Sequence, residues 1–319
     1  MTSLRLVRAR AAFFGLLTVL AFVGAAAGQT TQSIDRAQIT RDQNLGLPGP
    51  SPTPSGTGEL EMVTSPNDSD IGEQQLLRRT EGYQPFTASV AIPIYWTSNV
   101  ALTNSGEQGD LLTSPVAAVG YQPRITSNLS GYVGVREQQF YYKRLHDFDF
   151  GSFDVDVGLT YTVPQFYHVI LHMGYDYNRL TDKHNFDAFF ENHMLVLSAE
   201  LPVRISRAQQ LSIGIDGNIS LTANPEPPRR HDFDAYVAYT VQLTRAFSIS
   251  GSGRVVVHEY LHGDRRDVSE MVALNANYSV ANWFTVTGLA SYAANQSNHS
   301  VFDYEVGDLG GTLSFSIRF

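Results

Sequence analysis

The chain of 319 residues contains no cysteine, and this absence excludes several classes of protein. Without cysteine there is no disulfide-built secreted scaffold, no lipid-modified cysteine behind a leader and no thiolate chemistry. Basic residues are in the minority, with 22 Lys and Arg against 31 Asp and Glu, for a formal net charge of −9. This acidic balance argues against nucleic acid as a partner. After the first 28 residues no run of ~18 apolar residues occurs, so we expect no membrane-spanning helix.

Residues 1–28 have the features of a secretory signal peptide. Arg5, Arg8 and Arg10 precede an apolar run over residues 12–23, and Ala25–Ala27 offer small residues for cleavage. We therefore expect export across the inner membrane, and loss of the three arginines would take the formal charge from −9 to −12. A membrane anchor is the less favoured alternative, because polar residues follow at once.

Residues 29–80 have little apolar periodicity. Prolines at positions 48, 50, 52 and 54 stand among glycine, serine and threonine. This composition predicts a disordered Pro/Ser/Gly-rich periplasmic tail. A plug in a barrel lumen is the alternative, with one or two helical turns over residues 71–79.

From residue 81 to residue 319 the pattern becomes that of β-strands. In the last eleven residues, Leu309, Leu313, Phe315, Ile317 and Phe319 share one face, and mostly small or polar residues share the other. A strand between lipid and a polar lumen requires this period of two. Similar segments predict twelve strands, over residues 86–96, 114–122, 128–142, 151–163, 166–178, 192–203, 211–221, 233–243, 247–261, 268–280, 284–295 and 309–319.

The predicted connections alternate in length. They are tight after even-numbered strands and longer and more polar after odd-numbered ones, and both ends of the strand region lie on the tight side. This sorting is typical of outer-membrane barrels, and a soluble β-sandwich has no reason to adopt it. The sequence therefore predicts an all-β protein with a single antiparallel transmembrane β-barrel of about twelve strands.

The aromatic carboxyl terminus adds a resemblance. An alternating last strand that ends on Phe319 resembles the carboxyl-terminal signature of Gram-negative outer-membrane β-barrel proteins. The resemblance implies recognition of Phe319 as an assembly signal by the barrel-assembly machinery. It also implies an outer-membrane location, in contact with the lipid bilayer and lipopolysaccharide. We expect a monomer.

The phase of the strands predicts which side chains face the lumen. Inverting the register would place Asp154, Asp156 and Asp216 in hydrocarbon, at a cost of roughly several kcal/mol for each charge. The residues predicted to line the lumen are Arg136, Asp154, Asp156, His168, His172, Asp176, Glu200, Asp216, Asp234, Arg254, His258 and Arg318. Six carboxylates against three arginines predict a preference for cations.

Two histidine patterns are candidates for a metal site. His258-Glu259-Tyr260-Leu261-His262 matches the HExxH zinc motif, but it follows Val255-Val256-Val257 and reads as a strand that enters a loop. On a strand the two histidines would lie ~13 Å apart, so we predict no metal there. His146, His184 and His231 each begin a similar segment in a predicted loop, and a cation site at the mouth is the less favoured reading. No cofactor is expected.

The sequence thus predicts a passive, weakly cation-favouring channel for small solutes, without enzymatic activity. The alternative is a closed structural or surface-interaction barrel whose extracellular loops bind partners. An outer-membrane lipid hydrolase ranks third. The outer-membrane phospholipase motif has a histidine two residues before the serine, and Asn298-His299-Ser300 does not match it.

Overall fold

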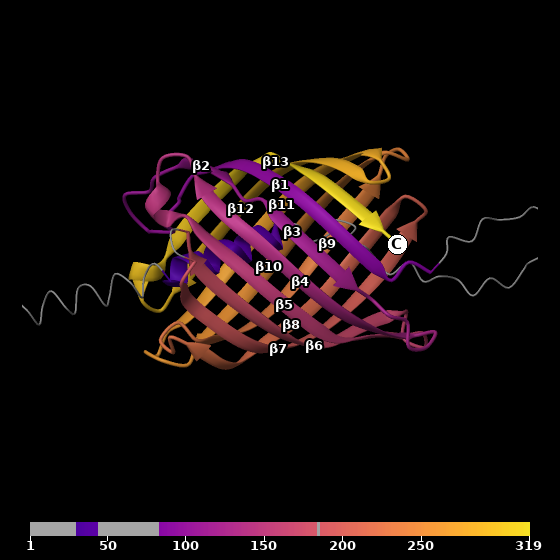
Figure 1. Cartoon of the computed structure of the whole chain (residues 1–319), viewed down its shortest axis with the longest axis horizontal. Coiled ribbons are helices and arrows are strands. Elements are labelled where there is room, and N and C mark those ends of the chain that lie inside the picture. The colour runs from indigo at the N-terminus through magenta and orange to yellow at the C-terminus, as the bar shows by residue number, and fades with distance from the viewer. Residues whose placement is uncertain (1–29, 44–82, 184–185) are drawn as a thin grey trace, which may run out of the picture.

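The computed structural model describes residues 30–43, 83–183 and 186–319. They form a closed antiparallel β-barrel with a helix over residues 30–42 inside it (Figure 1). No helix in these parts of the chain is long and apolar enough to cross a bilayer. The predicted signal peptide and residues 44–82, which include the proline-rich stretch, lie outside the described residues.

The wall consists of thirteen hydrogen-bonded strands. β2 and β3 follow one another between β1 and β4, so the barrel has the predicted twelve strand positions. The strands are β1 (Phe86–Thr97), β2 (Asp110–Thr113), β3 (Val116–Tyr121), β4 (Leu129–Tyr142), β5 (Phe150–Val163), β6 (Val169–Asp182), β7 (Ala188–Ser206), β8 (Gln209–Asn224), β9 (Arg230–Gln242), β10 (Phe247–Tyr260), β11 (Arg266–Ala281), β12 (Phe284–Ser297) and β13 (Tyr304–Arg318).

The second strand position is interrupted at Ser114 and Pro115. Proline has no amide hydrogen to donate to the ladder, so a break is expected there. The backbone nevertheless stays attached on both sides: the Ser114 amide donates to the Pro93 carbonyl at 3.1 Å, and the Gln139 amide donates to the Pro115 carbonyl at 3.0 Å. The wall therefore remains continuous.

Pairing of β1 with β13 closes the barrel, in register from Thr87 opposite Arg318 to Thr97 opposite Asp308. Beside this seam, Phe86 and Phe319 exchange two backbone hydrogen bonds of 3.0 and 3.1 Å. Their rings stack with centroids 5.6 Å apart. Phe319 thus lies at the closing seam, and its role as an assembly signal remains a prediction.

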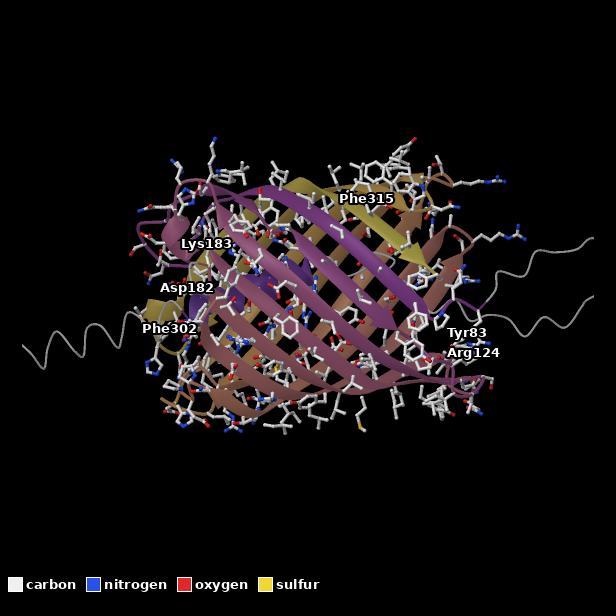
Figure 2. The ribbon with its side chains drawn as sticks, viewed as in Figure 1. Tyr83, Arg124, Asp182, Lys183, Phe302 and Phe315 are labelled. Carbon is white, nitrogen blue, oxygen red and sulfur yellow. The ribbon has the colours of Figure 1, made fainter. Side chains whose placement is uncertain are left out.

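The outward and inward side chains of the wall differ in polarity and burial. Outward side chains are apolar and exposed, as in Ile215 at 61% and Leu309 at 65%, whereas inward Asp154 and Asp234 are buried. Figure 2 shows Phe315 pointing away from the barrel. An apolar belt outside and polar groups inside define a transmembrane barrel of the outer-membrane type.

The connections differ in length less than predicted. We call the end with the connections 98–109, 143–149, 183–187, 225–229, 261–265 and 298–303 the loop end, and the opposite end the turn end. Several strands run on into segments predicted as loops, because backbone pairing such as Arg179 with Glu191 does not require apolar side chains. At the turn end, residues 122–128 form a connection two residues longer than the gap 123–127 between the predicted strands.

Candidate functional site: the lumen and its helix

The helix over residues 30–42 lies in the loop-end half of the lumen and has wall contacts on all sides. At ~100° per residue, its side chains fall into three groups. Asp35, Gln38, Ile39 and Asp42 share one face; Ile34, Ala37 and Arg41 share another; Arg36, Thr40 and Gln43 share the third. Most of these side chains are buried, although most are polar. Such a helix is stable only if the wall supplies polar partners.

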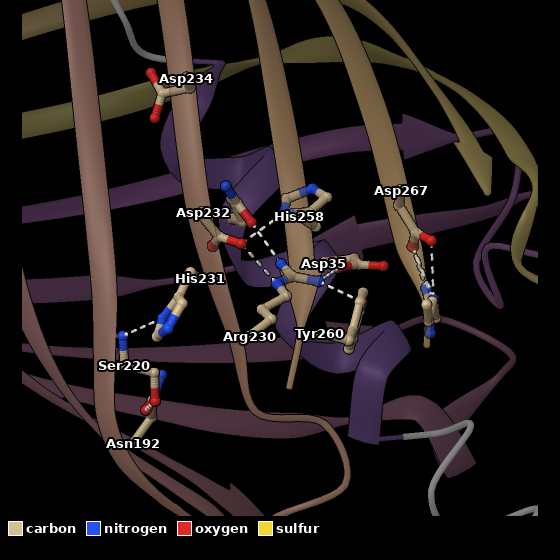
Figure 3. Close-up of polar contacts among 12 residues, drawn as sticks. Asp35, Asn192, Ser220, Arg230, His231, Asp232, Asp234, His258, Tyr260 and Asp267 are labelled. Atoms are coloured by element: carbon tan, nitrogen blue, oxygen red, sulfur yellow. Dashed lines mark hydrogen bonds and ion pairs between the residues drawn. The ribbon is translucent and has the colours of Figure 1, made fainter. Parts of the chain in front are cut away.

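The first face meets two arginines on adjacent strands. Arg230, the first residue of β9, contacts Asp35 at 2.6 Å and donates to the Gln38 side-chain oxygen at 2.7 Å. Further into the barrel, Arg254 of β10 contacts Asp42 at 2.5 Å. Figure 3 shows Arg230 beside Asp35 and Tyr260. Since Arg230 adjoins the connection 225–229, the helix enters at the loop end and ends near mid-barrel.

The third face reaches β13 and β1. Arg36 contacts Asp308 at 3.4 Å and donates to the Asn99 carbonyl at 2.6 Å. The hydroxyls of Thr40 and Tyr95 lie 3.0 Å apart. Gln43 also donates to Asp308. The carboxylate of Asp308 therefore holds the helix at two positions two turns apart.

Apolar contacts and one further ion pair complete the packing. Ala37 belongs to a buried cluster with residues of seven strands, and Ile34 packs against it. The members of this cluster are Ala37, Tyr95, Val100, Leu112, Phe140, Tyr142, Phe150, Leu180, Phe190 and Ala223. Ile39 joins a second cluster with Leu102, Met271, Ala293, Tyr304 and Val306. Arg41 contacts Asp154 of β5 at 3.2 Å.

Burial of the helix leaves little free space against β10–β12. A cavity of about 10 Å³ lies there between Asp42, His258 and Ser269, which is room for about one water molecule. Burial also raises the pKa of Asp42 to about 6, against the lowering effect of the Arg254 and Arg41 guanidinium groups. The carboxyl of Asp42 thus binds its proton more tightly when the helix is docked than it would in water.

The structure gathers several predicted lumen residues into one network. Asp216 and Asp234 are directly opposite on β8 and β9, and Arg254 lies 3.9 Å from the first and 2.7 Å from the second. His258 contacts Asp232 at 2.6 Å, and Asp232 also contacts Arg230 at 2.9 Å (Figure 3).

The other predicted residues lie nearer the turn end. Asp156 and Asp176 are opposite one another on β5 and β6, and neither has an ion-pair partner within 4 Å among the described residues. Arg136 faces inward opposite Asp154, and Arg318 lies near the turn-end rim. The prediction for His168 is wrong: it lies exposed in the turn between β5 and β6, because β6 begins at Val169.

Tyrosines and glycines shape the turn-end half of the lumen. Tyr236 lies over Gly214, where a Cβ atom would meet its ring at 2.2 Å, and its hydroxyl donates to Glu200 at 3.1 Å. Tyr132 covers Gly158 and Gly174 in the same way. Its hydroxyl is 2.6 Å from the Nε2 atom of His172. These rings lie along the wall, and no described helix fills this half.

The sequence reasoning missed the residues that hold the helix. Asp35, Arg36, Arg41 and Asp42 lie in the segment for which a disordered tail was favoured over a plug. Residues 30–43 instead occupy the lumen, as the plug alternative proposed, because partners on the wall satisfy their polar groups. The helical turns of that alternative were placed at residues 71–79, which lie outside the described residues. The missed wall partners are Arg230 and Asp308, and Asp232, which was also missed, pairs with Arg230. The spacing of Asp35 and Asp42, seven residues apart and therefore on one helix face, was the available signal.

The HExxH segment lies where β10 ends. As predicted, the HExxH segment is not helical: His258 and Tyr260 face inward on β10, His262 lies in the following turn, and outward Glu259 pairs with Arg266. Among the described residues, no group of three or more His, Asp or Glu side chains has a geometry that could hold a metal ion.

Comparison with known proteins bears out the architecture. No family model matches the chain, and no curated protein matches it. Among solved structures, an outer membrane channel from Pseudomonas putida F1 aligns over 79% of this chain and 100% of its own, with 11% identity and a TM-score of 0.52. The KdgM porin covers 72% of this chain and 99% of its own at 7% identity, with a TM-score of 0.41. The translocator domain of the autotransporter NalP from Neisseria meningitidis covers 75% of this chain and 90% of its own at 12% identity, also with a TM-score of 0.41.

The likeness to the Pseudomonas channel concerns the fold. The chain accordingly has the fold of an outer-membrane-type β-barrel.

Proposed function

We propose that the protein is a passive, weakly cation-favouring channel for small solutes in the outer membrane, and that helix 30–42 occludes its loop-end half. The observation that carries this proposal is the division of the lumen. A separate, ion-paired helix fills one half, while the other is lined by polar groups and has no described segment across it. A barrel that served only as a scaffold would not need a lumen of two such kinds.

The cation preference rests on Asp156 and Asp176. Asp154 and Asp234, which the sequence also placed in the lumen, are paired with Arg41 and Arg254 and contribute little net field. Asp156 and Asp176 are neighbours on one wall, and with Glu200 they make three carboxylates against Arg136 and Arg318 in this half of the lumen. Carboxylates in a narrow passage raise the local concentration of cations.

Passage requires that the helix moves. Thirty-nine residues, 44–82, separate Gln43 from Tyr83, which lies at the turn end beside Arg124 (Figure 2). A chain of that length reaches ~130 Å when extended, so it does not restrict withdrawal toward the turn end. We also propose that residues 1–28 are removed on export, which would leave the helix almost at the amino terminus of the mature chain.

Reversal potentials in a salt gradient test the proposal. Asp156→Asn with Asp176→Asn should reduce the cation preference of the conducting protein, whereas Asp264→Asn, at an exposed position of the loop-end rim, should leave it nearly unchanged. Asp264 has a φ of 49°, a conformation that asparagine tolerates. Anion preference of the unaltered protein would refute the charge argument.

A closed structural or surface-interaction barrel is the second candidate. The extent of the helix packing favours it, because the helix has polar or apolar partners on almost every strand. Planar bilayer recordings separate the two candidates: folded protein that never conducts, even after the helix contacts are weakened, supports the closed barrel. Monomeric state and contact with lipopolysaccharide and the barrel-assembly machinery remain part of the proposal.

A further inference from the structure

We propose that the loop-end half of the lumen is a peptide-binding site, and that residues 30–43 are a separable ligand that occupies it. The site would take a short helical peptide with two carboxylates seven residues apart on one face and arginines on the other two. This inference deepens the proposed channel function, since the ligand that binds there also blocks the passage.

The contacts of the helix are those of a bound ligand. Its charged groups pair with the wall: Asp35 with Arg230, Asp42 with Arg254, Arg36 with Asp308 and Arg41 with Asp154. No strand hydrogen bond of the barrel includes a residue of the helix, because β1 closes on β13 and every other strand pairs with its neighbours. The wall is therefore complete without the helix.

The arrangement of charges on the wall also selects which order of charges a bound helix can have. Arg230 and Arg254 lie on the β9–β10 side, whereas Asp308 and Asp154 lie on β13 and β5. A peptide with the opposite order of charges would place like charges together in a buried setting, where each mismatch is costly. Apolar pockets for Ala37 and Ile39 set the rotation of the helix about its axis.

The tether explains why the site is found occupied. A ligand joined to its site by the same chain has an effective concentration of about millimolar, so even weak intrinsic affinity gives high occupancy. A free peptide of the same sequence must compete with this tethered copy. Binding in trans should therefore become visible once the chain's own helix is repelled from the site.

The test uses the full-length chain with Asp35→Arg and Asp42→Arg, which sets two arginines against Arg230 and Arg254. A fluorescent peptide with the sequence of residues 29–44 is titrated, and binding is followed by anisotropy. We expect the peptide to bind this variant at least ~10-fold more tightly than it binds the unaltered protein, in which the tethered helix competes. A peptide that carries the same two substitutions should bind the variant ~100-fold more weakly than the natural peptide.

A charge swap guards against a variant that fails to fold. In the chain that carries Asp35→Arg and Asp42→Arg, a further Asp308→Arg reverses a wall charge whose side-chain partners, Arg36 and Gln43, both belong to residues 30–43. A peptide with Arg36→Asp should then bind this chain more tightly than the natural peptide. Equal binding of natural and charge-reversed peptides, or no binding to a barrel that keeps its heat-modifiable gel mobility, would overturn the inference. Because binding is measured without current, its failure is distinct from failure of the channel proposal.

Discussion

The two halves of the lumen are built from the same twelve strand positions but solve the problem of buried polar groups differently. In the loop-end half, every charged group of the helix meets an opposite charge on the wall, and two apolar clusters exclude water. In the turn-end half, Asp156 and Asp176 face one another with no ion-pair partner among the described residues. Unpaired carboxylates remain charged only where water can reach them.

This difference shows that two properties of a barrel are independent. One is which side chains point into the lumen, and the other is whether a packed segment occupies the lumen around them. The alternation of the strands decides which side chains point inward, and it is equally regular in both halves. Whether the inward groups meet water or a packed segment depends on residues 30–43, which are distant in the sequence. A count of lumen charges therefore overstates the field that a solute encounters, because Asp154 and Asp234 are already paired.

The largest effect should come from removing an arginine in the filled half. Arg254→Ala leaves the carboxylates of Asp42 and Asp234 buried without their shared counterion, at a cost of ~3–5 kcal/mol. We expect the free energy of folding into lipid vesicles, measured by urea titration, to fall by about this amount. Fluctuations to a conducting state should also become more frequent.

Arg136→Ala is the matched variant in the more open half. Arg136 has no ion pair within 4 Å among the described residues, so we expect a loss of at most ~1 kcal/mol. Equal losses for both variants would contradict the distinction between a packed and a wet half.

The next prediction compares the loss of folding free energy for substitutions on the outer and inner faces of the wall. Ile215→Arg places a guanidinium in the apolar belt and should cost ~2–4 kcal/mol of folding free energy near the bilayer midplane. Asn218 points inward on the same strand, opposite Asp232 of β9, so Asn218→Arg should be tolerated better. Vesicle folding titrations of both variants measure the difference. Similar destabilisation would remove the facing assignment.

The regular part of the fold could be predicted from the sequence. β4, β5 and β10 begin and end within one residue of their predicted bounds, because alternation is unbroken there and one face must meet lipid. The second strand was predicted least well: the ladder breaks at Ser114 and Pro115, and β2 lies before the predicted segment. His168 was misplaced because the turn that follows Pro164 is longer than a dipeptide.

The helix could not be recognised by the same reasoning. Most amphipathic helices in globular proteins reveal themselves by an apolar stripe, whereas here only Ile34, Ala37 and Ile39 are apolar and they do not share one face. Its stability comes from Arg230, Arg254 and Asp308, whose positions depend on strand register across the barrel. Register between distant strands is a property of the closed structure, so the partners become visible only there.

The smallest expected effect is the pH dependence of helix docking, which we attribute to the carboxyl of Asp42. Burial raises the pKa of Asp42 to about 6 in the docked helix, while a free helix in water would have the ordinary value of 3.8. The docked state thus binds the proton more tightly, and this contribution to docking is lost as the pH rises through 6. Between pH 7.5 and pH 5, the equilibrium constant for docking of the helix should increase about tenfold.

The control for this prediction is Asp42→Asn, because Arg254, Arg41, Asp234 and His258 surround the same carboxyl and can add their own response to pH. The fraction of time spent conducting should fall on acidification in the unaltered protein, and less so in Asp42→Asn. An identical pH response in both proteins would show that another group is responsible.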